Sequence, residues 1–503
     1  MARAKGWKRF NRNPVFDPEE VKTMTKDGIK ALQNMQLADG GWGWFSGFGE
    51  YSYPHTTAIV VHGLQLARDH KVVLPANMLE RGVAWLKNYQ TKQVELIKRA
   101  PAKVHPFKNY ADDLDAFIYM VLLDADATNN EMNEFLYRDR THISAYAKAV
   151  FGIALFKQKQ QQKLDMILRN LEQFLVQDEE NQTAYLKLPP ENHWWNWYGS
   201  DTEANAWYLK LLSKTNPKGE VPARLAKYIL NNRKHATYWN STRDTAFCIE
   251  ALAEFFTASQ EDKPDMTVEV LLDGKMIKEV KIGPKDLFTF ENTALVLGDG
   301  VLTGNHTVEL RKKGTGPLYF NAYLTVFTLE TPIKKAGLEV KINRKYYLLK
   351  KSATEVKVPG ARGEAVNQRG EKYERSEIQD LASVKSGDLV EIEMEILSKN
   401  DYEYILIEDM KAAGFEPVEL RSGYGNNDMR AYMELRDERV CFFIKELARG
   451  NHSLRYRMRA EIPGLFHALP AKINGMYAPE LTGNSDEIRI SIEDVPIAIG
   501  VGN

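Results

Sequence analysis

The hydrophobic period changes near Lys263-Pro264, and this change constrains the fold of the 503-residue chain more than any other feature. Before it, apolar residues recur every three or four positions, which is typical of amphipathic helices. After it, short segments alternate between apolar and polar residues, which is typical of strands with one buried face. A chain of this length and pattern is expected to form two to four domains, each with its own core.

The N-terminal half is predicted to be all-helical, from about Pro18 to Phe256. Three of its helical segments begin alike, because Thr57, Thr202 and Thr245 each lie near an alanine and precede a leucine by seven positions. A threonine there can cap the first helical turn, and the small residue lets two helices approach closely. The recurrence predicts stacked helical hairpins, and the irregular spacing favours an α/α toroid over a solenoid.

The C-terminal half is predicted to be all-β. Asp273-Gly274 separates two alternating segments and is a strong hairpin signal. Further strands are predicted at Thr307–Arg311, Tyr319–Leu329, Val390–Ile396, Val440–Ile444, His452–Arg459 and Glu487–Ile492. Such evenly spaced short strands indicate β-sandwiches.

These patterns together predict a multidomain chain, an all-α toroid followed by two all-β sandwich domains. We expect the toroid over residues 1–260, a β domain over 261–336 and a β-sandwich over 337–503. The charged, glycine-containing segment Lys350–Gln379 is predicted to be a loosely ordered excursion.

The charge balance argues against a nucleic-acid or membrane-surface partner, because 67 basic and 68 acidic residues are spread along the chain without a basic stripe. No apolar run approaches the ~20 residues of a membrane span, and the basic N-terminus lacks the apolar core of a signal peptide. The two cysteines, Cys248 and Cys441, are too few for a disulfide framework. We expect each to be a small buried hydrophobe.

The segment Gln36–Phe45 has a Gln-x3-Gly-x-Trp pattern formed by Gln36, Gly40 and Trp42, with Trp44 following. Triterpene cyclases repeat this pattern around a hydrophobic pocket. The same residues also suit a structural role, in which tryptophans fill the gap between hairpins and the glutamine satisfies helix-end groups. We favour the structural role.

No catalytic residue, cofactor or metal site is predicted. A cyclase needs clustered aspartates, but Asp112-Asp113-Leu114-Asp115 matches neither usual arrangement, and we expect these residues to cap a helix start. His55 and His62 lack an evident third ligand for zinc. His193 begins an aromatic run that could stack sugars, although filling the inner wall of the toroid is the favoured interpretation.

Several stretches resemble bacterial-type alpha-2-macroglobulins, in the order of that family. They are residues 39–47, 53–58, 239–246, 319–327, 344–347, 437–443, 455–460, 463–470 and 476–480. The resemblance implies that the toroid corresponds to the thioester domain, the middle block to the β domain into which the toroid is inserted, and the last block to the terminal macroglobulin-like sandwich.

The resemblance implies an endopeptidase inhibitor rather than an enzyme, which acts outside the cytoplasm, in the periplasm or extracellularly. In the family, a protease cuts a bait region, the inhibitor closes around it, and a Cys–Gln thioester acylates it. This sequence has no Cys-x-Glu-Gln, since Cys248 is followed by Ile249, Glu250 and Ala251. We therefore expect the thioester and bait region to come from upstream of residue 1 or from a partner chain.

The resemblance also implies one residue-level role. Aromatic residues of the terminal β-domain cover the thioester in the family, and Tyr477, with Met476 beside it, is the candidate here for such a lid or interdomain contact. The alternative is that Tyr477 only anchors a turn in its own sandwich.

Two other functions stay open at the level of sequence. One is an α/α-toroid enzyme that acts on terpenoids or polysaccharides, with accessory β-sandwiches. The other is a surface-binding protein whose sandwiches engage a ligand. A deep toroid cavity lined with facing carboxylates would favour the enzyme, whereas a centre filled by side chains would favour the inhibitor module.

Overall fold

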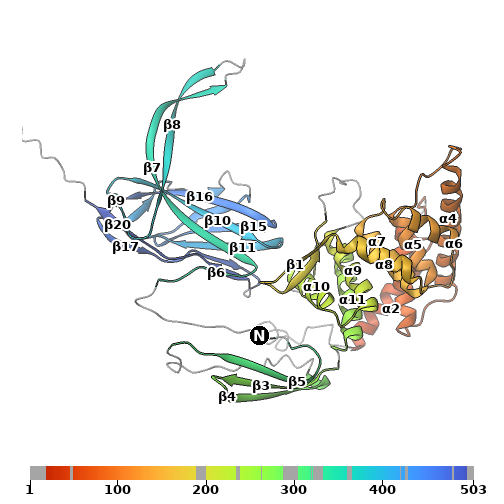
Figure 1. Cartoon of the computed structure of the whole chain (residues 1–503). Coiled ribbons are helices and arrows are strands. Elements are labelled where there is room, and N and C mark those ends of the chain that lie inside the picture. The colour runs from red at the N-terminus through yellow and green to blue at the C-terminus, as the bar shows by residue number, and fades with distance from the viewer. Residues whose placement is uncertain are drawn as a thin grey trace, which may run out of the picture. The chain divides into compact units, whose positions relative to one another are not determined.

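The computed structural model describes residues 18–45, 49–188, 200–233, 238–261, 263–286, 304–318, 320, 332–359, 365–419, 421–424, 429–478 and 481–494. The chain divides into two compact units. The first contains residues up to 177, 183–229 and 243–321, and the second contains 178–182, 230–242 and everything from 322 onward. Helices fill most of the first unit and strands fill most of the second (Figure 1).

The helical region confirms the period-3.6 prediction. Its helices are α2 (Pro18–Met35), α3 (Pro54–Asp69), α4 (Met78–Arg99), α5 (Asp113–Leu123), α6 (Asn130–Arg138), α7 (Ala145–Lys157), α8 (Gln161–Glu172), α9 (Asp201–Thr215), α10 (Glu220–Asn231) and α11 (Thr242–Ser259). None of these described helices is both long enough and apolar enough to cross a membrane.

The helices form an inner and an outer layer, as burial shows. Helices α5, α7 and α9 are buried on nearly all sides, whereas α4, α6 and α8 each bury one face. A helix that is apolar all round must lie inside, and an amphipathic one covers it. Neighbouring inner helices pack in order, α3 on α5, α5 on α7 and α7 on α9.

Helix α11 closes the inner layer into a ring. Its Glu250 contacts His62 of α3 at 3.0 Å and also pairs with Lys210 of α9. The last inner helix therefore bonds both to the one before it and to the first. This closure is what distinguishes an α/α toroid from an open solenoid, and it agrees with the predicted fold class.

The all-helical prediction missed one short hairpin. Strands β1 (Leu175–Asp178) and β2 (Thr183–Leu186) pair within the helical half. Its four-residue strands are too short to show a clear period in the sequence. The turn between them, residues 178–182, belongs to the second unit.

The predicted hairpin after the helices is confirmed. Strand β3 (Asp265–Leu272) pairs with β4 (Lys275–Ile282) and, on its other edge, with β5 (Val308–Thr315). Asp273 and Gly274 both have positive φ, 51° and 79°, as a tight two-residue hairpin turn requires. A short 3-10 turn, η2, covers Pro284–Asp286.

The second unit is a β-sandwich whose strands confirm the alternating pattern. They are β6 (Ala336–Gly337), β7 (Val340–Pro359), β8 (Ala365–Ile378), β9 (Ala382–Lys385), β10 (Leu389–Ser398), β11 (Tyr402–Met410), β12 (Phe415–Pro417), β13 (Gly423–Tyr424), β14 (Tyr432–Leu435), β15 (Arg439–Leu447), β16 (Gly450–Ala460), β17 (Gly464–Ala468), β18 (Lys472–Gly475), β19 (Thr482–Asn484) and β20 (Ile488–Glu493). The predicted strand Tyr319–Leu329 lies almost entirely outside the described residues.

Among the described residues, the sandwich consists of a five-stranded sheet, β12-β16-β10-β7-β8, and a seven-stranded sheet, β13-β14-β15-β11-β18-β19-β6. A smaller sheet joins β17, β20 and β9. Alternate residues of both sheets form one apolar core, for example Val390, Ile392 and Met394 of β10 and Ile405 and Ile407 of β11. The domain boundaries near 260 and 336 stay a prediction.

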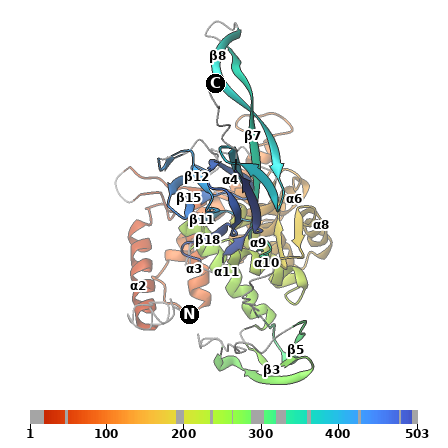
Figure 2. The same cartoon turned by 90° about the vertical axis from the view of Figure 1, so that its left-hand side faces the viewer.

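The loosely ordered excursion predicted at Lys350–Gln379 is wrong. Strands β7 and β8 pair antiparallel from Tyr346–Ile378 to Pro359–Ala365 and run out of the sandwich as a two-stranded ribbon (Figures 1 and 2). Charged residues interrupt this segment repeatedly, so its sequence shows no sustained apolar alternation. Backbone hydrogen bonds maintain the pairing instead.

Candidate functional site

The N-terminal ends of the inner helices form a polar region of the toroid. Ser144 caps α7, and its N–H donates to Asp113 of α5 at 2.8 Å. Ser200 caps α9, and its hydroxyl donates to Asp244 of α11 at 2.7 Å. Helix N-termini favour carboxylates because their free N–H groups carry partial positive charge. We call this end of the toroid the capped rim.

A buried ion pair lies at the capped rim between α9 and α11. Arg243 Nη2 donates to Glu203 Oε1 at 2.7 Å, and only 1% of Glu203 is exposed. Burial raises the pKa of Glu203 to about 7, against the opposing attraction of Arg243. Burial also lowers the pKa of His55 to about 3, with Arg243 acting in the same direction. Glu203 could exchange a proton near neutral pH, but its burial separates it from any substrate.

The aspartates of residues 112–115 cap a helix, as predicted. Asp112 accepts from the N–H of Asp115 and Asp115 accepts from the N–H of Asp112, which is a reciprocal capping box. Lys108 contacts both carboxylates at 2.6 Å. Burial, followed by the charge of Asp112, raises the pKa of Asp115 to about 6, although Lys108 opposes this. The carboxylates of Asp112 and Asp115 therefore bond to backbone groups at the start of α5.

A chain of buried charges runs behind the capped rim. Lys210 of α9 pairs with Glu250 and, at 3.3 Å, with Glu254, while Lys214 pairs with Glu254 at 2.8 Å. Burial alone would raise the pKa of Glu250, but the bonds from His62 and the charge of Lys210 outweigh it and lower the pKa to about 2. The charges neutralise one another locally, so they join helices rather than attract a ligand.

Aromatic side chains of several inner helices meet and pack against one another. The ring centroids of Trp207 and Phe247 lie 5.2 Å apart, and those of Trp207 and Phe117 lie 5.8 Å apart. Tyr146 and His62 also pack on Trp207, at 6.3 and 5.7 Å. The Lys210 ammonium lies 4.0 Å from the centroid of Trp207, a cation–π contact. Where these helices meet, the described rings pack tilted or edge to face around Trp207.

Neither cysteine presents a reactive thiolate. Cys248 lies inside α11 and is fully buried, and Cys441 lies buried in β15. Burial, helped by the charges of Asp244 and Glu203, raises the pKa of the Cys248 thiol, and burial raises that of Cys441. A thiolate is the nucleophilic form, so these two residues are the small buried hydrophobes that the sequence predicted. No group of three or more described histidines, cysteines or carboxylates could hold a metal ion.

The structure places the Gln36–Trp44 motif between α2 and α4. Gln36 Nε2 donates to the carbonyls of Gly40 and Met78, both at 2.9 Å, and Trp42 Nε1 donates to Leu32 O at 2.8 Å. Trp42 is 1% exposed, whereas Trp44 is 37% exposed. Gly40 has φ 98°, and a Cβ there would meet Arg81 O at 2.8 Å. These contacts support a structural role, which stays a proposal.

The predicted capping role of the recurrent threonines is wrong at Thr57. Helix α3 begins at Pro54, so Thr57 lies one turn inside it, and its hydroxyl accepts from the N–H of Trp42 at 2.9 Å. In α9 the cap is Ser200, two residues before Thr202. At Thr57 the small polar side chain thus bonds to the loop that carries Trp42.

Tyr477 and Met476 lie at the surface of the second unit. They are 52% and 48% exposed, and the Met476 N–H donates to Tyr404 O at 2.8 Å. The rings of Tyr477 and Tyr404 pack edge to face, with centroids 5.3 Å apart. Tyr404 has a positive φ of 55°, which is uncommon for a bulky residue. Tyr404, within β11, and Tyr477, just after β18, thus form an exposed aromatic pair.

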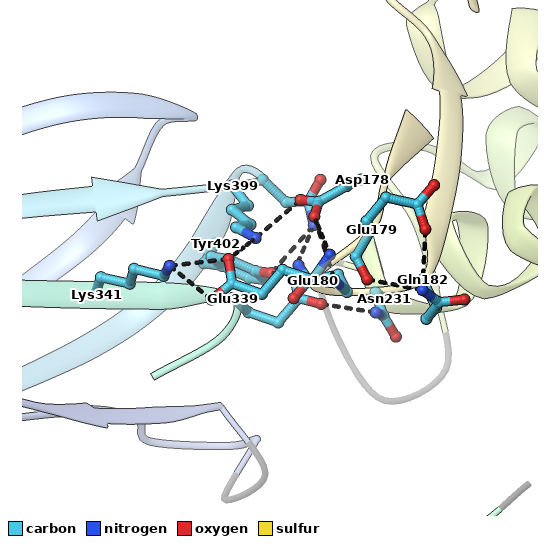
Figure 3. A network of polar contacts seen from close by, with 11 residues as sticks. Asp178, Glu179, Glu180, Gln182, Asn231, Glu339, Lys341, Lys399 and Tyr402 are labelled. Atoms are coloured by element: carbon cyan, nitrogen blue, oxygen red, sulfur yellow. Dashed lines mark hydrogen bonds and ion pairs between the residues drawn. The ribbon is translucent and has the colours of Figure 1, made fainter. Parts of the chain in front are cut away.

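A polar network in the second unit joins the turn 178–182 to the sandwich (Figure 3). Lys399 contacts Asp178 at 2.8 Å and Glu180 at 2.9 Å, and Lys341 contacts Glu180 at 2.7 Å. Burial opposes ionisation of Asp178, but the Lys399 bond lowers its pKa. The arrangement fixes the turn and offers no unpaired charge to a ligand.

The network continues on Glu339, which lies just before β7. Its carboxylate accepts from Tyr402 Oη at 2.9 Å, from Asn231 Nδ2 at 2.8 Å and from Asn400 Nδ2 at 3.2 Å. Asn231 is the last residue of α10 and belongs to the second unit. Sequence reasoning missed these residues because their partners are far apart in the chain.

The buried charges of the toroid were missed as well, although a signal for them exists. Lys210 and Lys214 lie four residues apart on one helix, and Glu250 and Glu254 lie four apart on another. Residues four apart share a helix face, so the two faces carry opposite charge at matching spacing. His193, which the sequence placed on the inner wall, lies outside the described residues.

Comparison with known proteins finds two family models. The A-macroglobulin TED domain matches residues 9–255, and the bacterial alpha-2-macroglobulin MG10 domain matches residues 340–480. The alpha-2-macroglobulin homolog of Nostoc sp. is 24% identical over 495 residues, which cover 93% of this chain and 23% of the relative. The alpha-2-macroglobulin of Thermotoga maritima is 25% identical over 334 residues, which cover 66% and 17%. The chain thus spans less than a quarter of these relatives.

Solved structures of similar arrangement include two of Escherichia coli alpha-2-macroglobulin. A native structure that spans domain MG7 to the C-terminus has 17% identity and a TM-score of 0.36, and covers 94% of this chain and 68% of that one. The trypsin-activated form has 16% identity and a TM-score of 0.43, and covers 92% and 29%.

Proposed function

Because the chain belongs to the alpha-2-macroglobulin family, we propose that it is a protease-inhibitor module that binds endopeptidases without covalent chemistry of its own. Its partners are proteases and an upstream macroglobulin region, which lies in the same or a partner chain and carries the thioester and bait region. It works outside the cytoplasm, in the periplasm or extracellularly, where foreign proteases arrive. The chain itself is not an enzyme.

The state of the two cysteines carries the non-covalent part of the proposal. A thioester requires a thiol and a glutamine carbonyl that meet across a tight turn. Cys248 lies buried within α11 with Ala251 three residues on, and Cys441 lies buried in β15 with Ile444 three residues on. Neither side chain has a glutamine partner at that spacing or access to a protease.

Protease capture tests this proposal directly. The chain is mixed with a panel of endopeptidases and analysed by size exclusion and then in SDS. We expect co-elution with at least one protease and complete dissociation in SDS. Failure to co-elute with any of them would contradict inhibition, and SDS-stable conjugates would contradict the absence of covalent chemistry.

Thiol titration provides an independent check of the same proposal. The folded chain should give no rapid reaction with a thiol reagent, and both cysteines should react after denaturation, because both are buried. Treatment with methylamine should release no new thiol. Release of one thiol would show that a thioester is present after all.

We further propose that Tyr477, with Met476, makes the interdomain contact that the family uses to cover a thioester. The observation that supports it is the exposed pair formed with Tyr404, since rings that protrude from a turn offer apolar area to a second surface. The alternative, a tyrosine that only anchors its own turn, predicts no contact beyond the sandwich.

Photo-crosslinking separates these two roles. Tyr477 is replaced by p-benzoylphenylalanine, the full chain is irradiated, and the crosslinked peptides are identified by mass spectrometry. Crosslinks to residues 18–177, 183–229 or 243–261 are expected, and crosslinks confined to the second unit would contradict the contact. Tyr424, which is 78% exposed and packs edge to face on Tyr432, is the matched control site.

A further inference from the structure

Strand β16 has an incompletely paired edge. On one side it pairs with β10 along its whole length, from Leu389–Arg459 to Ser398–Gly450. On the other side its partner in the described residues is β12, which covers only Met458 to Ala460. The remaining part of that edge lies at the margin of the five-stranded sheet.

Hydrogen bonds show which backbone groups face this edge. The N–H and C=O of Ala460 bond to Asp388 and Gly387, on the β10 side. Backbone direction alternates along a strand, so odd-numbered residues face away from β10, and Val418 N–H indeed donates to Arg457 O. Ser453 and Arg455 therefore direct their N–H and C=O groups outward, where no described residue bonds to them.

A cleft of about 1020 Å³ lies beside this part of β16, and its lining also includes residues of β7 and β10 such as Asn343, Glu393 and Glu395. Its apolar lining includes Leu454 of β16 with Met433 and Phe442 of the facing sheet. Its polar lining includes Ser453 and Arg455, whose side chains point to the opposite face of the strand from Leu454. The edge thus has an apolar side toward the core and a polar side toward the outer face.

The polar side carries exposed cations. Arg455 and Arg457 have side chains that are 52% and 43% exposed, although each also contacts a glutamate of β10. Those glutamates have a second cation of their own, because Arg375 contacts both Glu391 and Glu393. The two arginines therefore keep capacity for further carboxylates beside the open edge.

We propose that the edge of β16 at Ser453 and Arg455, where no described residue pairs with it, binds an extended peptide strand in which apolar side chains alternate with acidic ones. The backbone of such a strand pairs with Ser453 and Arg455, because unpaired strand edges are templates for strand addition. Its apolar side chains enter the cleft over Leu454, Met433 and Phe442. Its carboxylates lie beside Arg455 and Arg457. This surface is separate from the inhibitor function proposed above and does not depend on it.

Fluorescence anisotropy tests the proposal with a labelled synthetic peptide that alternates valine and glutamate, added to the full chain. Saturable binding is expected, and a peptide that alternates valine and lysine should bind at least about tenfold more weakly. Ser453→Pro removes one outward N–H and should weaken binding about tenfold, while Ser453→Ala, which loses the same hydroxyl, should bind normally. Equal binding by the two variants would overturn the proposal.

A charge-reversal variant and amide hydrogen exchange provide two further tests of strand binding at β16. If Ser453→Pro does not fold, Arg455→Glu is used, and it should shift preference toward the lysine peptide. Amide hydrogen exchange of the free chain should be fast at Ser453 and Arg455 and slow at His452 and Leu454, and the glutamate peptide should slow the first pair. Slow exchange at all four amides in the free chain would show that the chain covers its own edge.

Discussion

Buried charges at single positions hold the toroid closed, and Lys210 is the central one. Its side chain is only 3% exposed and lies between two glutamates of α11. Lys210→Met should cost roughly 3–5 kcal/mol of unfolding free energy, because it leaves Glu250 buried without its lysine partner. Lys214→Met is the matched control and should cost less than about 1 kcal/mol, since the pair of Lys214 with Glu254 is partly exposed. Urea unfolding followed by tryptophan fluorescence measures the stability of both variants. Equal losses of unfolding free energy would contradict the central role of Lys210.

A second residue-scale prediction concerns pH. The folded pKa of Glu203, about 7, lies above its ordinary value of 4.5, so stability from this group is present below pH 4.5 and lost as pH rises through 7. Glu203→Gln should therefore flatten the fall in stability between pH 4.5 and 7, by roughly 1.4 kcal/mol per unit of pKa shift. Thermal unfolding at several pH values measures the slope.

Glu250 should make the stability of the same fold depend on pH in the opposite direction. Its folded pKa of about 2 lies below 4.5, so its stability is present above pH 4.5 and lost as pH falls through 2. Glu250→Gln should flatten only the acidic limb of the profile. An unchanged slope between pH 4.5 and 7 in Glu203→Gln would contradict the raised pKa of that residue.

At the scale of elements, two helical glycines make opposite predictions. A Cβ on Gly82 of α4 would lie 2.7 Å from Val61 and 2.8 Å from Trp42, so this glycine permits α3, α4 and the Trp42 loop to approach. Gly82→Ala should destabilise by about 1–3 kcal/mol through overpacking, despite the better helix propensity of alanine. Gly63→Ala in α3 meets nothing within 4 Å and should stabilise by about 0.5–1 kcal/mol. Chemical denaturation measures the unfolding free energy of both variants. A change in the same direction for both would contradict the packing argument.

Elements whose apolar residues recur at a regular spacing could be predicted from the sequence. The inner and outer helices and strands β10, β15 and β16 place an apolar residue at each turn or at alternate positions, so their period is visible. The paired strands beyond residue 350, in β7 and β8, carry many charged residues and show no such period. Asp112 was predictable as a cap from its residue type alone, whereas the contact of His62 with Glu250 joins positions 188 residues apart. Local patterns carry no information on such pairings.

At the scale of the whole molecule, the two units place their charged side chains differently. The helical unit buries its ion pairs between helices, where they close a ring. The sandwich fixes the turn 178–182 with Lys341 and Lys399 and leaves cations at the edge of β16. The proposed strand binding is therefore assigned to the sandwich alone, at the edge of β16.

This separation predicts two thermal transitions, because each compact unit has its own core. Gly82→Ala lies in the helical unit and should lower only one transition. Ile392→Ala removes a fully buried side chain of the sandwich core, should cost about 2–5 kcal/mol, and should lower only the other. Differential scanning calorimetry measures both variants against the unaltered chain. A single transition that both substitutions lower would show that the units unfold as one, and would contradict their independence.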